Sequence, residues 1–267
     1  MEKIIINIDS RFSNKKLYNN SSKFTLNLDN TIKNVYDINI TSFEFINLYY
    51  TFSNKKNNNS FTFVYDSELY NLIIPDGFYQ SNDLINIIQT SFDNLIYGVF
   101  NISINSDNGK ITISSKNPFK IDFSNNSYIQ SLGYLLGFRN KKYNPSFNSS
   151  ISRYSITSEG LLNISGDNYL FLKVNDYGNL YTNFYYDIEN VLVPKKILAK
   201  LILSVNKTQT DFDNNTFISK KFIFRQPVNI SKFDIELLDP HGNTLDLNYM
   251  DFSFTIELNY LYQNESY

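Results

Sequence analysis

Few side chains in this 267-residue chain could carry chemistry, and it contains a single histidine. His241 follows Asp239 and Pro240 in a turn-forming run between two predicted strands. A Ser-His-Asp triad also needs an activated serine, and the sequence holds no Gly-x-Ser-x-Gly elbow to supply one. One histidine and no cysteine cannot close the tetrahedral site that zinc prefers. We therefore interpret His241 as a solvated turn residue and expect no metal site.

Carboxylates are the remaining candidates. Asp239, Asp246 and Asp251 lie close in sequence and carry the oxygen ligands that calcium prefers, but the twelve-residue spacing of an EF-hand loop is absent. Turn-forming and solvent-facing roles account for them better. A glycosidase needs two carboxylates across a cleft, and the sequence singles out no such pair. Since no glycine-rich phosphate loop occurs either, we expect no catalytic residue and no cofactor.

Aromatic side chains offer binding chemistry instead. The chain has 23 Phe and 21 Tyr but no Trp, so packing in a core explains most of them. Two adjacent pairs, Tyr49-Tyr50 and Tyr185-Tyr186, could serve as a stacking platform for sugars or as part of a protein interface, where tyrosine is favoured. We expect these four tyrosines to take part in an interface.

Composition excludes several classes of function. The formal net charge is −2, so there is no global positive field to attract a phosphate backbone, and direct binding of nucleic acid is not expected. No apolar stretch approaches the roughly 20 residues that a membrane-spanning helix needs. Cysteine is absent, so stability must come from burial rather than from disulfides.

The elements that must position these residues are mostly strands. Side chains in a strand alternate between its two faces, and residues 251–262 alternate without interruption. The apolar face is Phe252, Phe254, Ile256, Leu258, Tyr260 and Tyr262, and the polar face includes Asp251, Ser253, Thr255 and Glu257. We expect the polar face to be the outer surface and the first place where a neighbouring subunit binds.

The first 52 residues predict three further strands, at 4–8, 24–28 and 36–50. The middle of the chain differs, because apolar residues from Leu84 to Ile96 recur at spacings of three and four, which predicts a helix with Ser81 as its N-cap. Hairpins are predicted on both sides of this helix, and a second short helix before Gly137.

This order predicts an insertion. We expect the N- and C-terminal parts, 1–56 and 160–267, to pair into one jelly-roll-like antiparallel β-sandwich in a mainly β protein. Residues 57–159 then form an inserted small α+β module of hairpin, helix, hairpin and short helix.

Several stretches together resemble the minor capsid and penton-type (vertex) proteins of the nucleocytoplasmic large DNA viruses and their relatives. They follow one another in order over nearly the whole chain, and although each is weak alone, their joint order is more specific. They are Asp9-Ser10-Arg11-Phe12, 32–35 with 42–52, 74–79 with 83–85, 135–138, 168–172 with 175–176, and 227–230 through 252–254.

The resemblance implies a structural protein of the virion with a jelly-roll-like sandwich, and it brings no catalytic residues. The implied partners are the major capsid protein and other capsid subunits, in a homo-oligomer or a hetero-assembly within a capsid that forms in the host cytoplasm. A module that binds host glycan or receptor through residues 57–159 is the alternative function. A carboxylate-based glycosidase is third.

Overall fold

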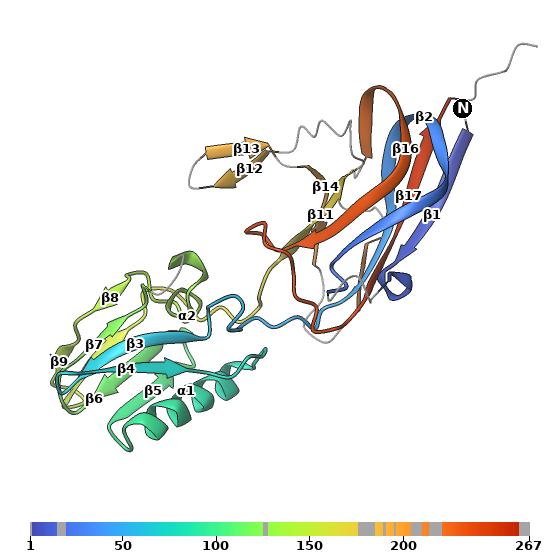
Figure 1. Cartoon of the computed structure of the whole chain (residues 1–267). Coiled ribbons are helices and arrows are strands. Elements are labelled where there is room, and N and C mark those ends of the chain that lie inside the picture. Colours follow the sequence, from blue (N-terminus) through green and yellow to red (C-terminus); the bar gives the residue numbers. More distant parts are fainter. Residues whose placement is uncertain are drawn as a thin grey trace, which may run out of the picture. The chain divides into compact units, whose positions relative to one another are not determined.

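The computed structural model describes residues 2–14, 20–124, 128–175, 185–188, 191–194, 196–203, 210–213 and 221–261. It divides the chain into two compact units: unit 1 comprises 1–49 and 167–267, and unit 2 comprises 50–166. Both are built mainly from antiparallel strands (Figure 1), which confirms the predicted fold class.

Unit 1 contains a seven-stranded antiparallel sheet with the order β1-β17-β2-β16-β11-β14, in which β15 also pairs with β2. Its strands are β1 (Glu2–Asp9), β2 (Lys23–Ile46), β11 (Tyr169–Asn175), β14 (Ile197–Ile202), β15 (Thr210–Asp213), β16 (Lys221–Leu238) and β17 (Phe252–Tyr260). A separate hairpin consists of β12 (Tyr185–Ile188) and β13 (Val191–Pro194), and the 3₁₀ turn η1 (Ser10–Phe12) follows β1.

The two strands expected at 24–28 and 36–50 are one continuous strand, β2, of 24 residues. The separate strands were predicted because a polar stretch lies between them. In the structure this stretch stays paired with β16 through register shifts, with Ile32 opposite Ile230 and Val35 opposite Val228. Asn34 takes a positive φ of 57° at the irregularity, a conformation that Asn tolerates better than most residues. The long strand therefore bends rather than ends.

Bending brings the two halves of the sheet face to face. The Phe24 ring, near the start of β2, lies 6.2 Å from the ring of Phe252 in β17. Phe252 also lies 6.3 Å from Phe43, which belongs to the other half of β2 and pairs with Phe254 of β17. Both halves contribute to one apolar core, so unit 1 is a β-sandwich made from a curved sheet, as the jelly-roll-like prediction requires.

The alternation predicted for the last strand is present in β17. Phe252, Phe254, Ile256 and Leu258 are buried, and the residues between them are half-buried. The strand lies between β1 and β2, so its backbone is paired on both sides. Tyr262 lies outside the described residues.

Unit 2 contains two four-stranded sheets, with the orders β4-β3-β7-β8 and β5-β6-β10-β9. The first is formed by β3 (Ser60–Tyr65), β4 (Glu68–Ile73), β7 (Phe119–Asp122) and β8 (Lys142–Tyr143). The second is formed by β5 (Phe100–Ile104), β6 (Ile111–Ser115), β9 (Ser146–Asn148) and β10 (Arg153–Thr157). The helical elements are α1 (Ser81–Leu95), η2 (Tyr128–Gln130) and α2 (Leu132–Leu135).

The helix α1 forms where the apolar spacing predicts it and buries Leu84, Ile85, Ile88 and Phe92. Its cap was predicted wrongly. Gln80, with extended backbone angles, is the N-cap residue and makes no side-chain capping bond, while Ser81 is already helical. Burial of the apolar face therefore fixes where this helix begins, without a capping side chain.

A cluster of phenylalanine rings fills unit 2. Phe123 belongs to it, with ring centroids 5.1 Å from Phe61 and 5.2 Å from Phe138. Gly133 in α2 lies directly on the Phe123 ring, so closely that a Cβ atom there would be 2.2 Å from Phe123 Cγ. Glycine is thus required where α2 meets the core.

Glu236 is a buried carboxylate in β16 that links three segments of unit 1. Its Oε2 accepts a 2.7 Å hydrogen bond from Lys173 Nζ in β11, and its Oε1 accepts one from the Thr244 hydroxyl. Lys23 Nζ, from β2, lies 3.4 Å from Glu236 Oε1. Burial opposes ionisation, but the hydrogen bonds from Lys173 and Thr244 outweigh it and lower the pKa of Glu236 below its ordinary value.

This lowered pKa predicts a pH-dependent contribution to stability. The contribution is complete above the pKa of Glu in the unfolded chain, about 4.3, and is lost as the pH falls through the lower folded value. We expect Glu236→Gln to reduce the free energy of unfolding by about 1.5–3 kcal/mol at pH 7, because hydrogen bonds to a charged group are lost. Urea titrations from pH 7 to pH 3 measure the free energy of unfolding of both chains. The difference between Glu236→Gln and the native chain should become smaller as the pH falls.

Glu257→Gln is the matched control. Glu257 forms an ion pair with Lys3, whose side chain is 59% exposed. Exposed ion pairs contribute less than about 1 kcal/mol to the free energy of unfolding. A loss in Glu236→Gln that stays constant down to pH 3 would contradict the role given to the ionised carboxylate.

Candidate functional site

The polar face of β17 is bound laterally to both neighbouring strands. Ser253, Thr255 and Glu257 are half-buried, and each forms a hydrogen bond with a side chain of β1 or β2. The contacts are Ser253 Oγ to Glu44 Oε2 (2.9 Å), Thr255 Oγ1 to Asn7 Oδ1 (3.3 Å) and Lys3 Nζ to Glu257 Oε2 (3.2 Å). The structure thus brings three of the predicted interface residues together on one face, which we call the outer face.

The same face carries an exposed apolar side chain. Ile5 of β1 lies opposite Glu257 in the strand register and is 62% exposed. The face therefore combines hydroxyl, carboxylate, ammonium and aliphatic groups.

Asp251 has a more local role than the other three. It precedes β17, and its Oδ1 accepts a 2.7 Å hydrogen bond from Ser10 Oγ. Ser10 is fully buried and its Oγ accepts the backbone N–H of Phe252 at 3.1 Å. Asp251 and Ser10 together fix the turn η1 against the start of β17.

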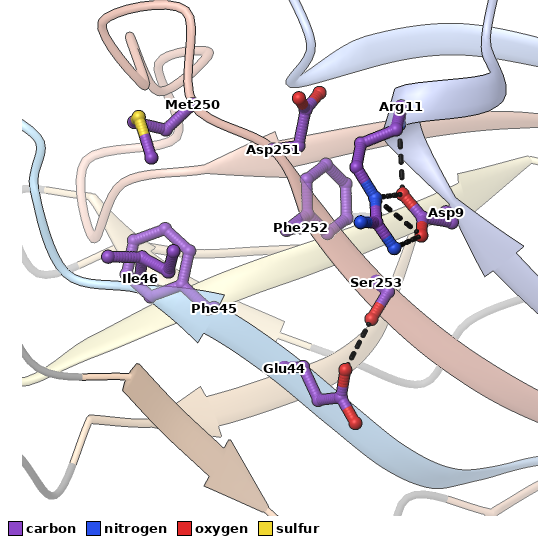
Figure 2. A pocket seen from close by; sticks show the side chains of 9 residues that line it. All are labelled: Asp9, Arg11, Glu44, Phe45, Ile46, Met250, Asp251, Phe252 and Ser253. Atoms are coloured by element: carbon purple, nitrogen blue, oxygen red, sulfur yellow. Dashed lines mark hydrogen bonds and ion pairs between the residues drawn. The ribbon is translucent and has the colours of Figure 1, made fainter.

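A cavity of about 300 Å³ lies beside this junction (Figure 2). Figure 2 shows Met250, Ile46 and Phe45 on one side and the paired Asp9 and Arg11 on the other, with Phe252 between them. Asp251, Glu44 and Ser253 complete the lining. The cavity therefore has an apolar wall facing charged groups.

Arg11 is held by a local motif. Asp9 Oδ1 accepts the backbone N–H of Arg11 at 2.9 Å, and both carboxylate oxygens accept hydrogen bonds from the guanidinium. The hydrogen bonds and negative charge of Asp9 raise the pKa of Arg11, and Asp251 and Glu44 add to this effect. The guanidinium is thus kept charged and aligned, although its side chain is 67% exposed.

The predicted tyrosines are not gathered into one platform. Tyr49 is 1% exposed, and its ring packs 6.1 Å from Phe45 in the core of unit 1, so the prediction that it contributes to an interface is corrected. Burial raises its pKa strongly, and its hydroxyl accepts the backbone N–H of Asp167 at 3.3 Å. Tyr50 is 36% exposed. Tyr185 and Tyr186 lie in β12, and their side chains are outside the described part of the chain.

The residues weighed for catalysis are turn residues. Asp239 Oδ1 accepts the backbone N–H groups of His241 and Asn243, both at 2.9 Å, so this carboxylate builds the turn. Asp246 accepts the N–H of Asn248 in the same way, at 3.1 Å. Among the described residues, no group of three His, Cys, Asp or Glu side chains could hold a metal ion.

Unit 2 has a cavity of its own, of about 320 Å³, on the sheet β4-β3-β7-β8. Leu69, which is 71% exposed, lies at one part of it, and Lys120, Tyr143 and Asn144 line other parts.

No helix in the described ranges is long and apolar enough to cross a membrane.

Sequence reasoning did not assign roles to Glu44, Asp9, Arg11 or Met250. Two signals were available. Glu44 alternates with the buried Phe43 and Phe45, which places it on the outer face. An Asp two residues before an Arg can accept both the backbone and the side-chain donors of that residue, which is the contact between Asp9 and Arg11.

No protein-family model and no curated protein matches the chain. Among solved structures, the chain is similar to the crystal structure of the mavirus penton protein, with a TM-score of 0.52 and 12% sequence identity. The match covers 98% of this chain and 100% of the penton chain. It confirms, as a likeness of fold, the resemblance to penton-type proteins that the sequence stretches indicate. Over nearly its whole length the chain therefore has the fold of a viral penton protein.

Proposed function

We propose that this chain is a structural protein of the virion, a minor capsid or vertex component of the icosahedral shell of a large double-stranded DNA virus. The observation that carries the proposal is the extent of the likeness: it covers 98% of this chain and all of the mavirus penton protein. Both units, rather than the sandwich alone, therefore have counterparts in a protein named as a penton.

Its action is architectural: it binds neighbouring chains and catalyses no reaction. The outer face is the proposed contact in unit 1, with Ser253, Thr255 and Glu257 as polar groups and Ile5 as an apolar one. Their cross-strand hydrogen bonds fix the side chains before binding, so little conformational entropy is lost when a partner covers them. The proposed partners are the major capsid protein, further capsid subunits and other copies of this chain, in a capsid that assembles in the host cytoplasm.

Cross-linking mass spectrometry on purified virus particles tests this function. We expect the chain to be present in the particles and to cross-link to the major capsid protein through outer-face lysines such as Lys3, whose side chain is 59% exposed. Particles that lack the chain would contradict the proposal, as would particles in which it cross-links only to proteins outside the shell.

A second candidate function is recognition of a host glycan or receptor by unit 2. The observation that favours it is the cavity on the sheet β4-β3-β7-β8, which combines Lys120, Tyr143 and Asn144 with exposed aliphatic surface. A glycan array probed with the full chain and with its Lys120→Ala variant tests whether unit 2 recognises glycans in addition to the structural role. Binding that Lys120→Ala abolishes would support this second function, and an array without signal would remove glycans as its ligand.

A further inference from the structure

The cavity of unit 1 is matched in chemistry to a long cationic side chain. Its apolar wall, formed mainly by Ile46 and Met250, suits an aliphatic stem. Three carboxylates and one guanidinium line the rest, which gives the lining a formal charge of −2. Lysine and arginine have this dual character, with an apolar stem and a charged head.

The position of Glu44 strengthens the match. It lines the cavity from β2, where it already accepts a hydrogen bond from Ser253 Oγ through Oε2. Glu44 and Asp251 both add to the electrostatic stabilisation of the Arg11 cation, so both carboxylates act on positive charge at the charged side of the cavity. A second cation on the apolar side of the cavity would meet the same two carboxylates.

The loop that leads into Met250 of the cavity lining has a strained backbone. Asn248 and Tyr249 have consecutive positive φ angles of 52° and 64°, which a bulky residue such as tyrosine rarely adopts. Asn248 is held by Asp246 Oδ1 at 3.1 Å and by the carbonyl of Leu48 at 3.2 Å. Strain of this kind persists where surrounding contacts impose it, and it gathers at ligand-binding sites.

That loop presents an unusually exposed ring. Tyr249 is 91% exposed, and it directly precedes Met250 of the apolar wall. Phe12, 83% exposed, directly follows Arg11 of the charged wall. Large aromatic residues with this exposure next to a cavity are the residue types that carry binding energy in protein interfaces. Burying them would gain free energy that the isolated chain lacks.

We propose that this end of unit 1 docks an extended segment of a neighbouring protein chain and inserts one lysine or arginine side chain into the cavity. The stem lies on Met250 and Ile46, the cationic head binds Glu44 and Asp251, and flanking apolar residues of the segment cover Phe12 and Tyr249. The inference rests on the proposed structural role for the nature of its partner, and it adds the chemistry by which that partner is recognised.

An array of pentapeptides tests the proposal with the full chain. The central residue is arginine, lysine or citrulline, and the flanking positions carry leucine, phenylalanine or serine. Citrulline keeps the size and shape of arginine without its charge. We expect the arginine and lysine peptides with apolar flanks to bind at least about tenfold more tightly than the citrulline peptides, because a charged hydrogen-bonding group is lost.

Three variants locate the binding. Glu44→Gln should weaken the arginine peptides about tenfold and reduce their advantage over citrulline. Glu2→Gln makes the same change in charge at the other end of β1, outside the cavity lining, and should leave binding unchanged. Tyr249→Gly removes the ring that the segment covers, so binding should weaken, and it relieves the backbone strain, so the melting temperature should stay the same or rise.

The proposal would be overturned by equal binding of arginine and citrulline peptides, by an array in which no peptide binds, or by full binding in Glu44→Gln. These outcomes are independent of the cross-linking experiment. A chain that cross-links to the shell but binds no basic peptide keeps its structural role and loses only this docking site.

Discussion

Replacing Phe252 by alanine should reduce the free energy of unfolding of unit 1 by about 3–5 kcal/mol. The ring is 3% exposed and lies within 6.3 Å of Phe24, Phe43 and Phe254. Truncation removes its burial and leaves a cavity between rings that belong to both halves of the curved sheet. Because the strands on either side are fixed by pairing, the space cannot collapse fully.

Denaturant unfolding followed by near-ultraviolet circular dichroism measures this loss. Phe12→Ala is the matched control, since the same side chain is removed from a position that is 83% exposed, and its effect should stay within about 0.5 kcal/mol. Equal losses of stability in the two variants would contradict the role of Phe252 in packing the two halves of the curved sheet together.

Gly133→Ala should be the most damaging substitution of a single methyl group, with a loss of about 3 kcal/mol in unit 2. The added Cβ would lie 2.2–2.6 Å from three atoms of the Phe123 ring. That ring cannot move easily, because Phe61 and Phe138 contact it on other sides. Differential scanning calorimetry should therefore show a lower melting temperature for the variant.

A double variant separates this steric cause from a general effect of alanine on α2. Phe123→Leu leaves more room beside Gly133, so the loss in Gly133→Ala/Phe123→Leu should be smaller than the sum of the two single losses. Gly98→Ala provides a second comparison: its φ is +69° but nothing lies within 4 Å of the added Cβ, so it should cost only about 1–2 kcal/mol from the backbone. Additive losses in the double variant would rule out the steric explanation.

The strands and the helix were predictable because their signals are local. Alternation over residues 251–262 requires only that one face be buried, and β17 follows it. The spacing of Leu84, Ile88 and Phe92 likewise gives α1. The continuity of β2 was not predictable in this way. It depends on pairing between Ile32 and Ile230, nearly two hundred residues apart, which compensates for a polar stretch that looks like a loop.

The candidate site shows the same division. The polar side of β17 was predicted, since it follows directly from strand periodicity. The cavity was not, because it requires η1, the end of β2 and the start of β17 to meet. Tyr49 illustrates the opposite error: its type suggested an interface, but the core of unit 1 covers it almost completely. Residue type alone does not reveal which side of a strand end is covered.

The pairing of β1 with β17 has a consequence for how the protein is made. Glu2 lies opposite Tyr260 and Asp9 opposite Ser253, so the first strand finds its partner only after almost the entire chain has been synthesised. Unit 2 is continuous in sequence and can fold while the ribosome is still adding the second half of unit 1. Until then Ile4, Ile6 and Ile8 lack the strand with which they pair in the folded sheet.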